Sequence, residues 1–122
     1  MSDAPPPRLR LRIHFADDSM LGPGKADLLQ AIRDTGSISA AGRQMKMSYK
    51  RAWQLVETMN TMFRLPLVER SRGGAAGGGA VITDEGLAVL AEFRALEQVL
   101  LQDGADQLQS LTARLRDISD QK

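Results

Sequence analysis

The stretch GSISAAGRQMKMSYKRAWQLVETMNTMF, residues 36–63, carries two helix signals in close succession. Ser37 is suited to cap a short helix that ends near Met45, and the small Ala40 and Ala41 let a neighbouring helix approach closely. Ser48 is suited to cap a second, longer helix. Two helices separated by only a few residues, the second basic at its start, are typical of a helix-turn-helix.

The longer helix is predicted to have one apolar and one polar face, because its apolar side chains recur at the i, i+3, i+4, i+7 spacing. The inward face is expected to comprise Tyr49, Ala52, Trp53, Val56, Met59 or Asn60, and Phe63. The outward face carries Lys50, Arg51, Gln54, Glu57 and Thr61. Pro66 prevents the helix from continuing.

A glycine-rich hairpin is predicted next. Short strands are expected at 67–70 and 79–83, and the segment 70–79 contains Arg70, Arg72 and five glycines. This segment is a poor phosphate cradle for a nucleotide, because it lacks the spacing of a Walker loop and no Lys-Ser or Lys-Thr pair follows it. A flexible wing that approaches a nucleic-acid groove accounts for both the glycines and the arginines.

The N-terminal part is predicted to supply an arm, a strand and a first helix. Residues 1–7 contain three consecutive prolines and are expected to be disordered. Residues 8–15 alternate polar and apolar side chains, which predicts a half-buried strand. Its inner face is Leu9, Leu11, Ile13 and Phe15. A helix is expected from about Lys25 to Asp34, with Gly36 at its C-terminal cap.

The C-terminal part is predicted to be helical and unusually apolar. Thr83 or Asp84 is suited to cap a helix running to about Gln102. Asp103-Gly104 favours a break, and the sequence leaves open whether 103–119 continues the helix or folds back. The long helix carries the apolar positions Leu87, Val89, Leu90, Phe93, Leu96, Leu100 and Leu101.

A second apolar seam follows that break. Leu108, Leu111, Leu115 and Ile118 succeed one another at spacings of 3, 4 and 3 residues, which is an amphipathic helix pattern. Together the two stripes are more than a small domain needs to cover its own core, so we expect a dimer interface here. Its predicted residues are Leu90, Phe93, Leu96, Leu100, Leu108, Leu111 and Leu115.

These elements predict a mainly α fold with a small β-sheet, a winged helix-turn-helix with a long C-terminal dimerisation helix. We expect residues 1–7 to be an arm, 8–83 the winged helix-turn-helix, and 84–122 the helical dimerisation region.

The charge of the chain is divided unevenly along its length. The 122 residues have a net charge of +1, but residues 1–83 sum to +5 and residues 84–122 to −4. Within 43–72 alone there are 7 basic and 2 acidic residues. Positive charge is thus concentrated on the predicted helix-turn-helix and wing, as expected if one face meets phosphates.

The composition argues against several other classes of protein. There is no cysteine, no run of 18 apolar residues and no apolar secretion signal, so we expect a cytoplasmic protein without disulfides or a membrane span. His14 is the single histidine, and no carboxylate pair is placed beside an obvious nucleophile or base. We therefore expect neither an enzyme nor a metal or cofactor site.

Side chains on the second helix, the turn, the third helix and the wing are the predicted DNA contacts. Lys50 and Arg51 supply charge, and Arg51 or Gln54 is suited to read guanine or adenine edges in the major groove. Tyr49 and Trp53 are suited to base stacking, although core packing is favoured for both. The predicted set is Ser37, Ser39, Arg43, Lys46, Ser48, Tyr49, Lys50, Arg51, Gln54, Arg70 and Arg72.

Several short segments spread over about residues 20–90 form a combined pattern: Gly36-Ser37-Ile38-Ser39, Ser48-Tyr49-Lys50 with Ala52-Trp53, Met59-Asn60, Val68-Glu69-Arg70, Gly73-Gly74, and Gly77-Gly78-Gly79-Ala80 with Thr83 and Gly86. In these segments the sequence resembles the DNA-binding domain of ModE-type molybdate-responsive regulators and, more distantly, LysR-type winged helices. The resemblance implies a winged-helix homodimer on a palindromic operator, with residues 48–51 in the recognition helix and Arg70 and Arg72 in the wing. It also implies that the N-terminal strand joins the wing sheet and that the C-terminal helices help dimerise.

Full-length members of that family carry a C-terminal pair of small β-barrels that bind molybdate. The sequence up to Lys122 contains no such barrels, so we expect no direct molybdate binding by this chain.

The sequence therefore predicts a homodimeric DNA-binding transcriptional regulator that reads an inverted repeat through a recognition helix and a basic wing. Two alternatives stay open. One is a protein-interaction module on a winged-helix scaffold, and the other is a small oxyanion-binding protein that uses the glycine loop or the dimer seam.

Overall fold

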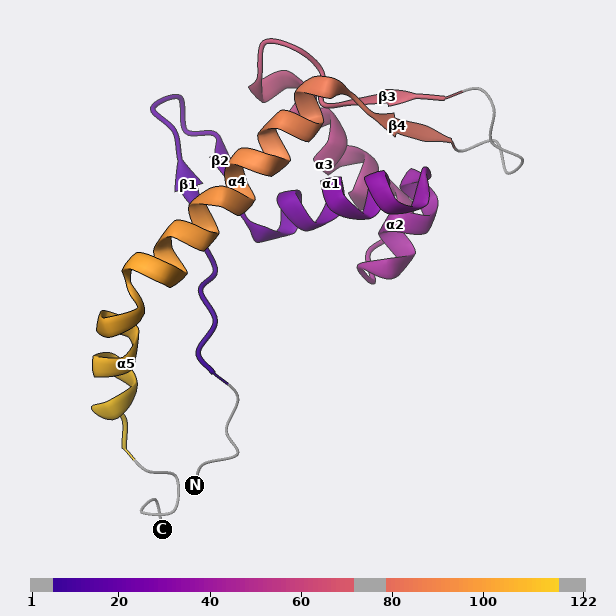
Figure 1. Ribbon diagram of the computed structural model, residues 1–122. Coiled ribbons are helices and arrows are strands. Elements are labelled where there is room, and N and C mark those ends of the chain that lie inside the picture. The colour runs from indigo at the N-terminus through magenta and orange to yellow at the C-terminus, as the bar shows by residue number, and fades with distance from the viewer. Residues whose placement is uncertain (1–5, 72–78, 117–122) are drawn as a thin grey trace.

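A computed structural model describes residues 6–71 and 79–116 of the chain. Within these ranges the elements, in order, are β1 (Ile13–His14), β2 (Met20–Leu21), α1 (Pro23–Thr35), α2 (Ile38–Gln44), α3 (Tyr49–Met62), β3 (Val68–Arg70), β4 (Ala80–Ile82), α4 (Asp84–Asp103) and α5 (Ala105–Ala113) (Figure 1). The predicted tip of the wing, 73–79, lies outside the described residues except for Gly79, and so do Arg72, Ile118 and most of the predicted arm.

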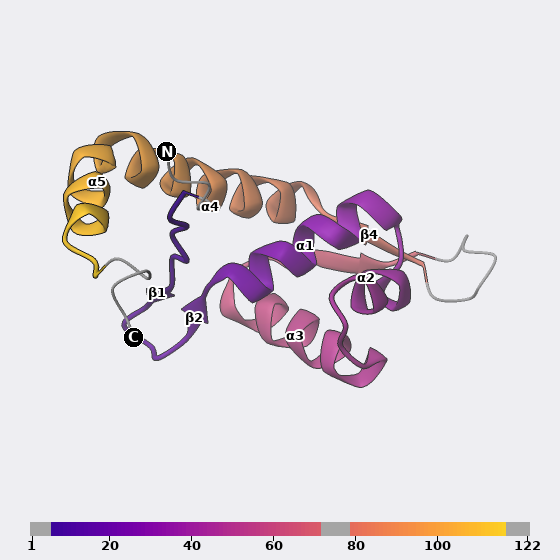
Figure 2. The same cartoon turned by 90° about the horizontal axis from the view of Figure 1, so that it is seen from below.

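The helix α1 forms the centre of the fold. Leu28, Leu29 and Ile32 have no exposed surface, and the helix contacts α2, α3, β4 and α4. Figure 2 shows α1 lying between α3 on one side and α4 on the other. The helix ends at Gly36, whose φ of 70° is the left-handed conformation that glycine adopts without strain. The predicted helix and its cap are confirmed, with an earlier start at Pro23.

The helix-turn-helix is confirmed, including both of its predicted caps. The Ser37 hydroxyl accepts the Ala40 N–H at 3.1 Å, and the Ser48 hydroxyl accepts the Arg51 N–H at 3.0 Å. Gly42 lets the two helices pack tightly, because a Cβ there would lie 3.3 Å from the Cβ of Ala52. The glycine of α2 therefore serves helix packing.

The wing is an antiparallel pair in which Val68 faces Ile82 and Arg70 faces Ala80. Asn60 of α3 fixes its base: its side chain accepts the Leu67 N–H at 2.8 Å and donates to the Val68 carbonyl at 3.0 Å. The predicted strands are confirmed within one residue at each end.

The N-terminal strand differs from its prediction in length and in partner. Arg8–Phe15 alternates half-buried and exposed side chains up to His14 as expected, but only Ile13 and His14 pair with another strand. Their partner is β2, in a sheet separate from β3 and β4. The short β2 ends where Gly22 and Pro23 begin α1, so no partner is left for the preceding residues.

The expected junction of the N-terminal strand with the wing sheet is therefore wrong. Among the described residues, it is the turn between α1 and α2 that flanks β4. The Ala80 N–H donates to the Gly36 carbonyl at 3.0 Å, and Ser37 forms a bridge with Gly79. The wing is thus attached directly to the helix-turn-helix.

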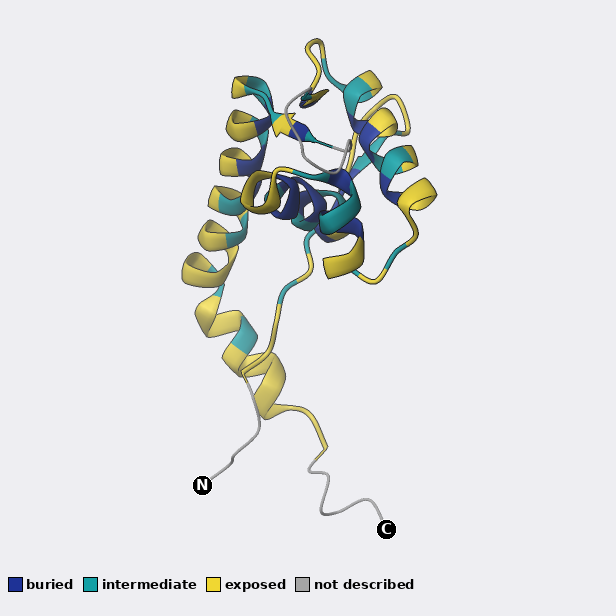
Figure 3. Ribbon diagram, turned by 90° about the vertical axis from the view of Figure 1, so that its right-hand side faces the viewer, coloured by how far each residue is buried: buried dark blue, intermediate teal, exposed yellow. Residues whose placement is uncertain are grey.

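The C-terminal helix breaks where the sequence favours it. Thr83 caps α4, its hydroxyl accepting the Gly86 N–H at 2.9 Å and donating to the Pro66 carbonyl at 2.7 Å. Gly104 ends α4 and precedes α5, a separate helix with no buried residue. Figures 1 and 3 show α5 projecting away from the body, with almost all of its surface exposed.

Three helical side chains differ from the prediction in whether they are buried or exposed. Leu90 and Phe93, expected in a dimer interface, are 2% and 1% exposed and fill the chain's own core. They face inward because the first part of α4 packs against α1. Tyr49, expected inward, is 50% exposed because it is the first residue of α3, before the helix reaches the core.

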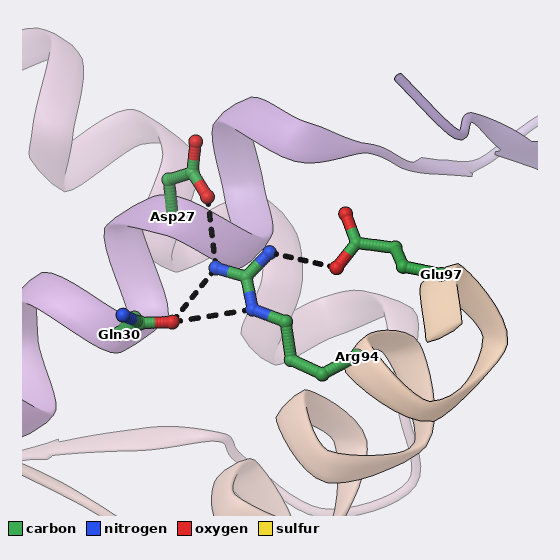
Figure 4. Close-up of polar contacts among 4 residues, drawn as sticks. All are labelled: Asp27, Gln30, Arg94 and Glu97. Atoms are coloured by element: carbon green, nitrogen blue, oxygen red, sulfur yellow. Dashed lines mark hydrogen bonds and ion pairs between the residues drawn. The ribbon is translucent and has the colours of Figure 1, made fainter. Parts of the chain in front are cut away.

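A polar cluster joins α4 to α1 beside that apolar contact (Figure 4). The Arg94 guanidinium donates to Asp27 at 2.8 Å, to Gln30 at 2.8 Å and to Glu97 at 3.1 Å. Burial alone lowers the pKa of Arg94, but the hydrogen bonds to Asp27 and Glu97 outweigh it and raise the pKa above its ordinary value. The cluster fixes how α4 lies across α1.

Gly86→Ala is expected to destabilise the fold by about 1–3 kcal/mol, because overpacking forces backbone or side chains to shift. A Cβ at position 86 would lie 2.3 Å from the Leu67 carbonyl oxygen and 2.6 Å from Cγ1 of Ile82. Urea unfolding measures the change. Gly24→Ala in α1 is the control, since a Cβ there meets nothing within 4 Å. An equal effect of both substitutions would contradict the packing described.

Candidate nucleic-acid interface

The first turns of α3 present a polar surface. Tyr49, Lys50, Arg51 and Gln54 are all exposed, while Ala52 and Val56 on the other side are buried. Backbone N–H groups at a helix start favour anions, and the cationic side chains beside them add to that effect. The start of α3 therefore combines an end that attracts phosphate with an exposed polar face.

The predicted contacts on α2 and the turn differ in how free their side chains are. Ser37 and Ser48 are committed to helix caps, as described above. Ser39 accepts a hydrogen bond from Arg43 Nη1 at 2.8 Å, which orients that guanidinium on the surface of α2. Lys46 is exposed in the turn, where its φ of 59° places it in the left-handed region.

A cluster of side chains connects the wing to α3. The guanidinium of Arg70 lies over the ring of Trp53, 4.4 Å from its centroid. On α3, Trp53 Nε1 donates a hydrogen bond to the Tyr49 hydroxyl, and the two rings meet edge to face. Trp53 is half-buried against the core, so core packing holds for it but not for Tyr49. The stack orients Arg70 relative to α3.

The positive charge of this face is not neutralised by ion pairs among the described residues. Within the described residues, the three ion pairs join Arg33 to Asp34, Arg94 to Asp27 and Arg94 to Glu97. None involves the predicted contacts Arg43, Lys46, Lys50, Arg51 and Arg70. An unpaired cationic face of this kind attracts a polyanion.

Three functional or positioning residues were missed from the sequence. Asn60 holds the base of the wing, and Arg94 holds α4 against α1. The sequence does not show these roles, because the position of a polar residue on an amphipathic helix does not reveal which distant residue it will contact. Lys25 lies close to Arg51, and its Nζ donates to the Met20 carbonyl at 2.7 Å. Burial lowers the pKa of Lys25, and the charge of Arg51 lowers it further.

The part of the chain that the structure describes contains no group of three or more His, Asp or Glu residues arranged to hold a metal ion. None of its helices combines the length and the apolar surface needed to cross a membrane.

These elements define a winged helix-turn-helix. The family model described as "Bacterial regulatory helix-turn-helix protein, lysR family" matches residues 25–87. Because this match covers more than half of the chain, the chain belongs to that family.

Curated relatives include proteins named for molybdenum. The chain is 47% identical over 77 residues to the molybdenum-pterin-binding protein MopB of Rhodobacter capsulatus, which covers 63% of this chain and 28% of MopB. It is 38% identical over 108 residues to the DNA-binding transcriptional dual regulator ModE of Escherichia coli K12, covering 83% of this chain and 39% of ModE. The resemblance to ModE-type proteins is thus confirmed, although the chain spans only 28% and 39% of these relatives.

Solved structures confirm the fold. The DNA-binding domain of CbnR in complex with DNA matches with a TM-score of 0.57 and 20% identity, over 75% of this chain and 97% of that domain. Full-length CbnR with its target DNA matches with a TM-score of 0.54 and 19% identity, over 69% of this chain and 27% of CbnR.

A double-mutant cycle between Trp53→Leu and Arg70→Ala is expected to give a coupling energy of about 0.5–1 kcal/mol, because each substitution removes the same cation–π contact. Urea unfolding measures the coupling energy. Circular dichroism follows the unfolding, because Trp53→Leu removes the single tryptophan and with it the tryptophan fluorescence signal. The control cycle combines Trp53→Leu with Glu69→Ala instead of Arg70→Ala. Glu69 is the exposed neighbour of Arg70 on β3, so this cycle should show almost no coupling. Equal coupling in both cycles would argue against the stack.

Proposed function

We propose that this chain is the DNA-binding part of a transcriptional regulator that acts as a homodimer on an inverted-repeat operator. The observation that carries the proposal is the unpaired cationic surface of α3, next to a wing whose Arg70 stacks on Trp53. The relative named as a DNA-binding dual regulator and the neighbour solved with DNA support it.

In the proposed complex, α3 enters the major groove. Arg51 and Gln54 read base edges, because guanidinium and amide groups match guanine and adenine respectively. Lys50 and the Tyr49 hydroxyl lie at the start of the helix, where backbone phosphates approach. Arg43, held by Ser39, is proposed to contact phosphate, which positions the protein without specifying sequence.

The remaining predicted contacts have supporting roles. Lys46 is proposed to meet phosphate from the turn, while Ser37 and Ser48 act mainly by capping the helices that present the basic side chains. Arg70 is proposed to approach the DNA backbone from the base of the wing. The same contact is proposed for Arg72, which is not among the described residues.

The proposed dimer uses the outer part of α4 together with α5. Large apolar side chains are exposed on these two helices and just after α5, although the core of the chain is already filled: Leu96, Val99, Leu100, Leu101, Leu111 and Leu115. Leu108 is half-buried at the same end. Leu90 and Phe93 are not part of the proposed interface, because their side chains are buried in the core of the chain.

Selection of bound duplexes from a random pool at about 150 mM salt, where purely electrostatic binding is weakened, tests the function. We expect an inverted repeat whose half-sites lie about one helical turn apart. Arg51→Ala should then lose about 1–3 kcal/mol of discrimination at one position of the half-site. The exposed Arg64→Ala, beyond the end of α3, is the control. Enrichment of no sequence would refute specific DNA reading.

Leu111→Glu is expected to shift the protein from dimer to monomer, because it places a charge in the proposed interface. Leu111 is 63% exposed, so the folded monomer tolerates the substitution. Sedimentation equilibrium measures the change, and Leu65→Glu, at a position 57% exposed outside α4 and α5, is the matched control. A wild-type monomer, or dissociation by both variants, would exclude this interface.

A further inference from the structure

A surface pocket of about 290 Å³ lies between the N-terminal hairpin, the start of α1 and α3. We call it the basic pocket. Three cationic side chains from three parts of the chain line it, namely Arg12, Lys25 and Arg51, together with Gly22, Gly24 and Met47. Its lining contains no carboxylate. Such a convergence of like charges is unfavourable unless an anion joins it.

The three cations have no acidic partner in the part of the chain that the structure describes. Arg12 and Arg51 are exposed, and none of the ion pairs described above includes them or Lys25. Lys25 Nζ gives one hydrogen bond to the Met20 carbonyl, which leaves two of its three donors available. Burial lowers the pKa of Lys25, and the charge of Arg51 lowers it further; only the second, smaller effect reflects the nearby cation.

The start of α1 adds to the positive potential of the pocket. Whereas α2, α3 and α4 are capped by Ser37, Ser48 and Thr83, α1 has no side-chain cap and no acidic residue in its first turn. The positive end of its helix dipole is therefore uncompensated. The absent side chain at Gly22 also leaves room for Arg12, because a Cβ there would lie 3.1 Å from Cγ of Arg12.

We propose that the basic pocket binds one phosphate group of the DNA backbone, beside the groove that α3 reads. This rests on the proposed function. The DNA backbone is favoured over a small free anion because the pocket is open at the surface and shares Arg51 with the exposed face of α3. Arg12 and Lys25 thereby become DNA-contacting residues outside the helix-turn-helix and the wing.

The test measures affinity for the selected duplex and for random DNA over a range of salt concentrations. Arg12→Gln and Lys25→Met should each weaken binding to both DNAs alike and lower the slope of log K against log salt by about 0.9. Arg10→Gln is the matched control, since Arg10 is also exposed, two residues away, but does not line the pocket. It should leave the slope unchanged. The Arg12 side chain is exposed and forms no ion pair within the described residues, so its variant is expected to fold normally.

The second arm titrates inorganic phosphate and follows the amide NMR signals of Gly24 and Lys25. Shifts that saturate, and that Arg12→Gln abolishes, would show that the pocket also accepts a free anion. Unshifted amides together with the slope change would assign the site to DNA phosphate alone.

Two outcomes overturn the proposal. If the wild-type chain binds DNA but Arg12→Gln and Lys25→Met behave like Arg10→Gln, the pocket is no phosphate site and the proposed function stands. If the wild-type chain binds no DNA, the proposed function fails. In that case the pocket survives as an anion site only if phosphate produces the saturable shifts.

Discussion

The burial of α1 is the constraint on which the other elements depend. Leu28, Leu29 and Ile32 are completely covered, and burial of each such side chain contributes about 1.5–3 kcal/mol. They are covered from different sides, because α2, α3, β4 and α4 all contact this helix. The directions of the proposed recognition helix, the wing and the long C-terminal helix are therefore set by one apolar core.

Polar contacts then fix details that apolar packing leaves free. Asn60 ties the base of the wing to α3, and Thr83 caps α4 while it bonds to the Pro66 carbonyl. Hydrogen bonds of this kind contribute about 1 kcal/mol each, but they are directional and so select one register. Arg70 and Trp53 add a contact from the wing to the helix. These links hold the unpaired cations in a defined arrangement.

The two surfaces that support the proposed function lie on different parts of the molecule. The cationic surface belongs to α2, α3 and the base of the wing, whereas the exposed apolar side chains of the proposed interface belong to α4 beyond Phe93, to α5 and to Leu115 just after it. Figure 2 places α5 and the wing at opposite ends of the view. Arg94 joins these parts through Asp27 and Gln30 of α1. A dimer formed through α4 and α5 would thus present two outward-facing basic surfaces, as an inverted repeat requires.

Local features follow from the sequence alone: the helices, the caps at Ser37 and Ser48, and the helix end at Gly36. These depend on periodicity and on hydrogen bonds between near neighbours. The structure selects Thr83 over Asp84 as the cap of α4 and shows the break at Gly104, which the sequence favoured but left open. Three features arise only when the chain folds: the pairing of Ile13 with β2 rather than with the wing, the burial of Leu90 and Phe93 in the core, and the convergence of Arg12, Lys25 and Arg51. Periodicity defines a face but not what covers it, because the covering residues are distant in sequence.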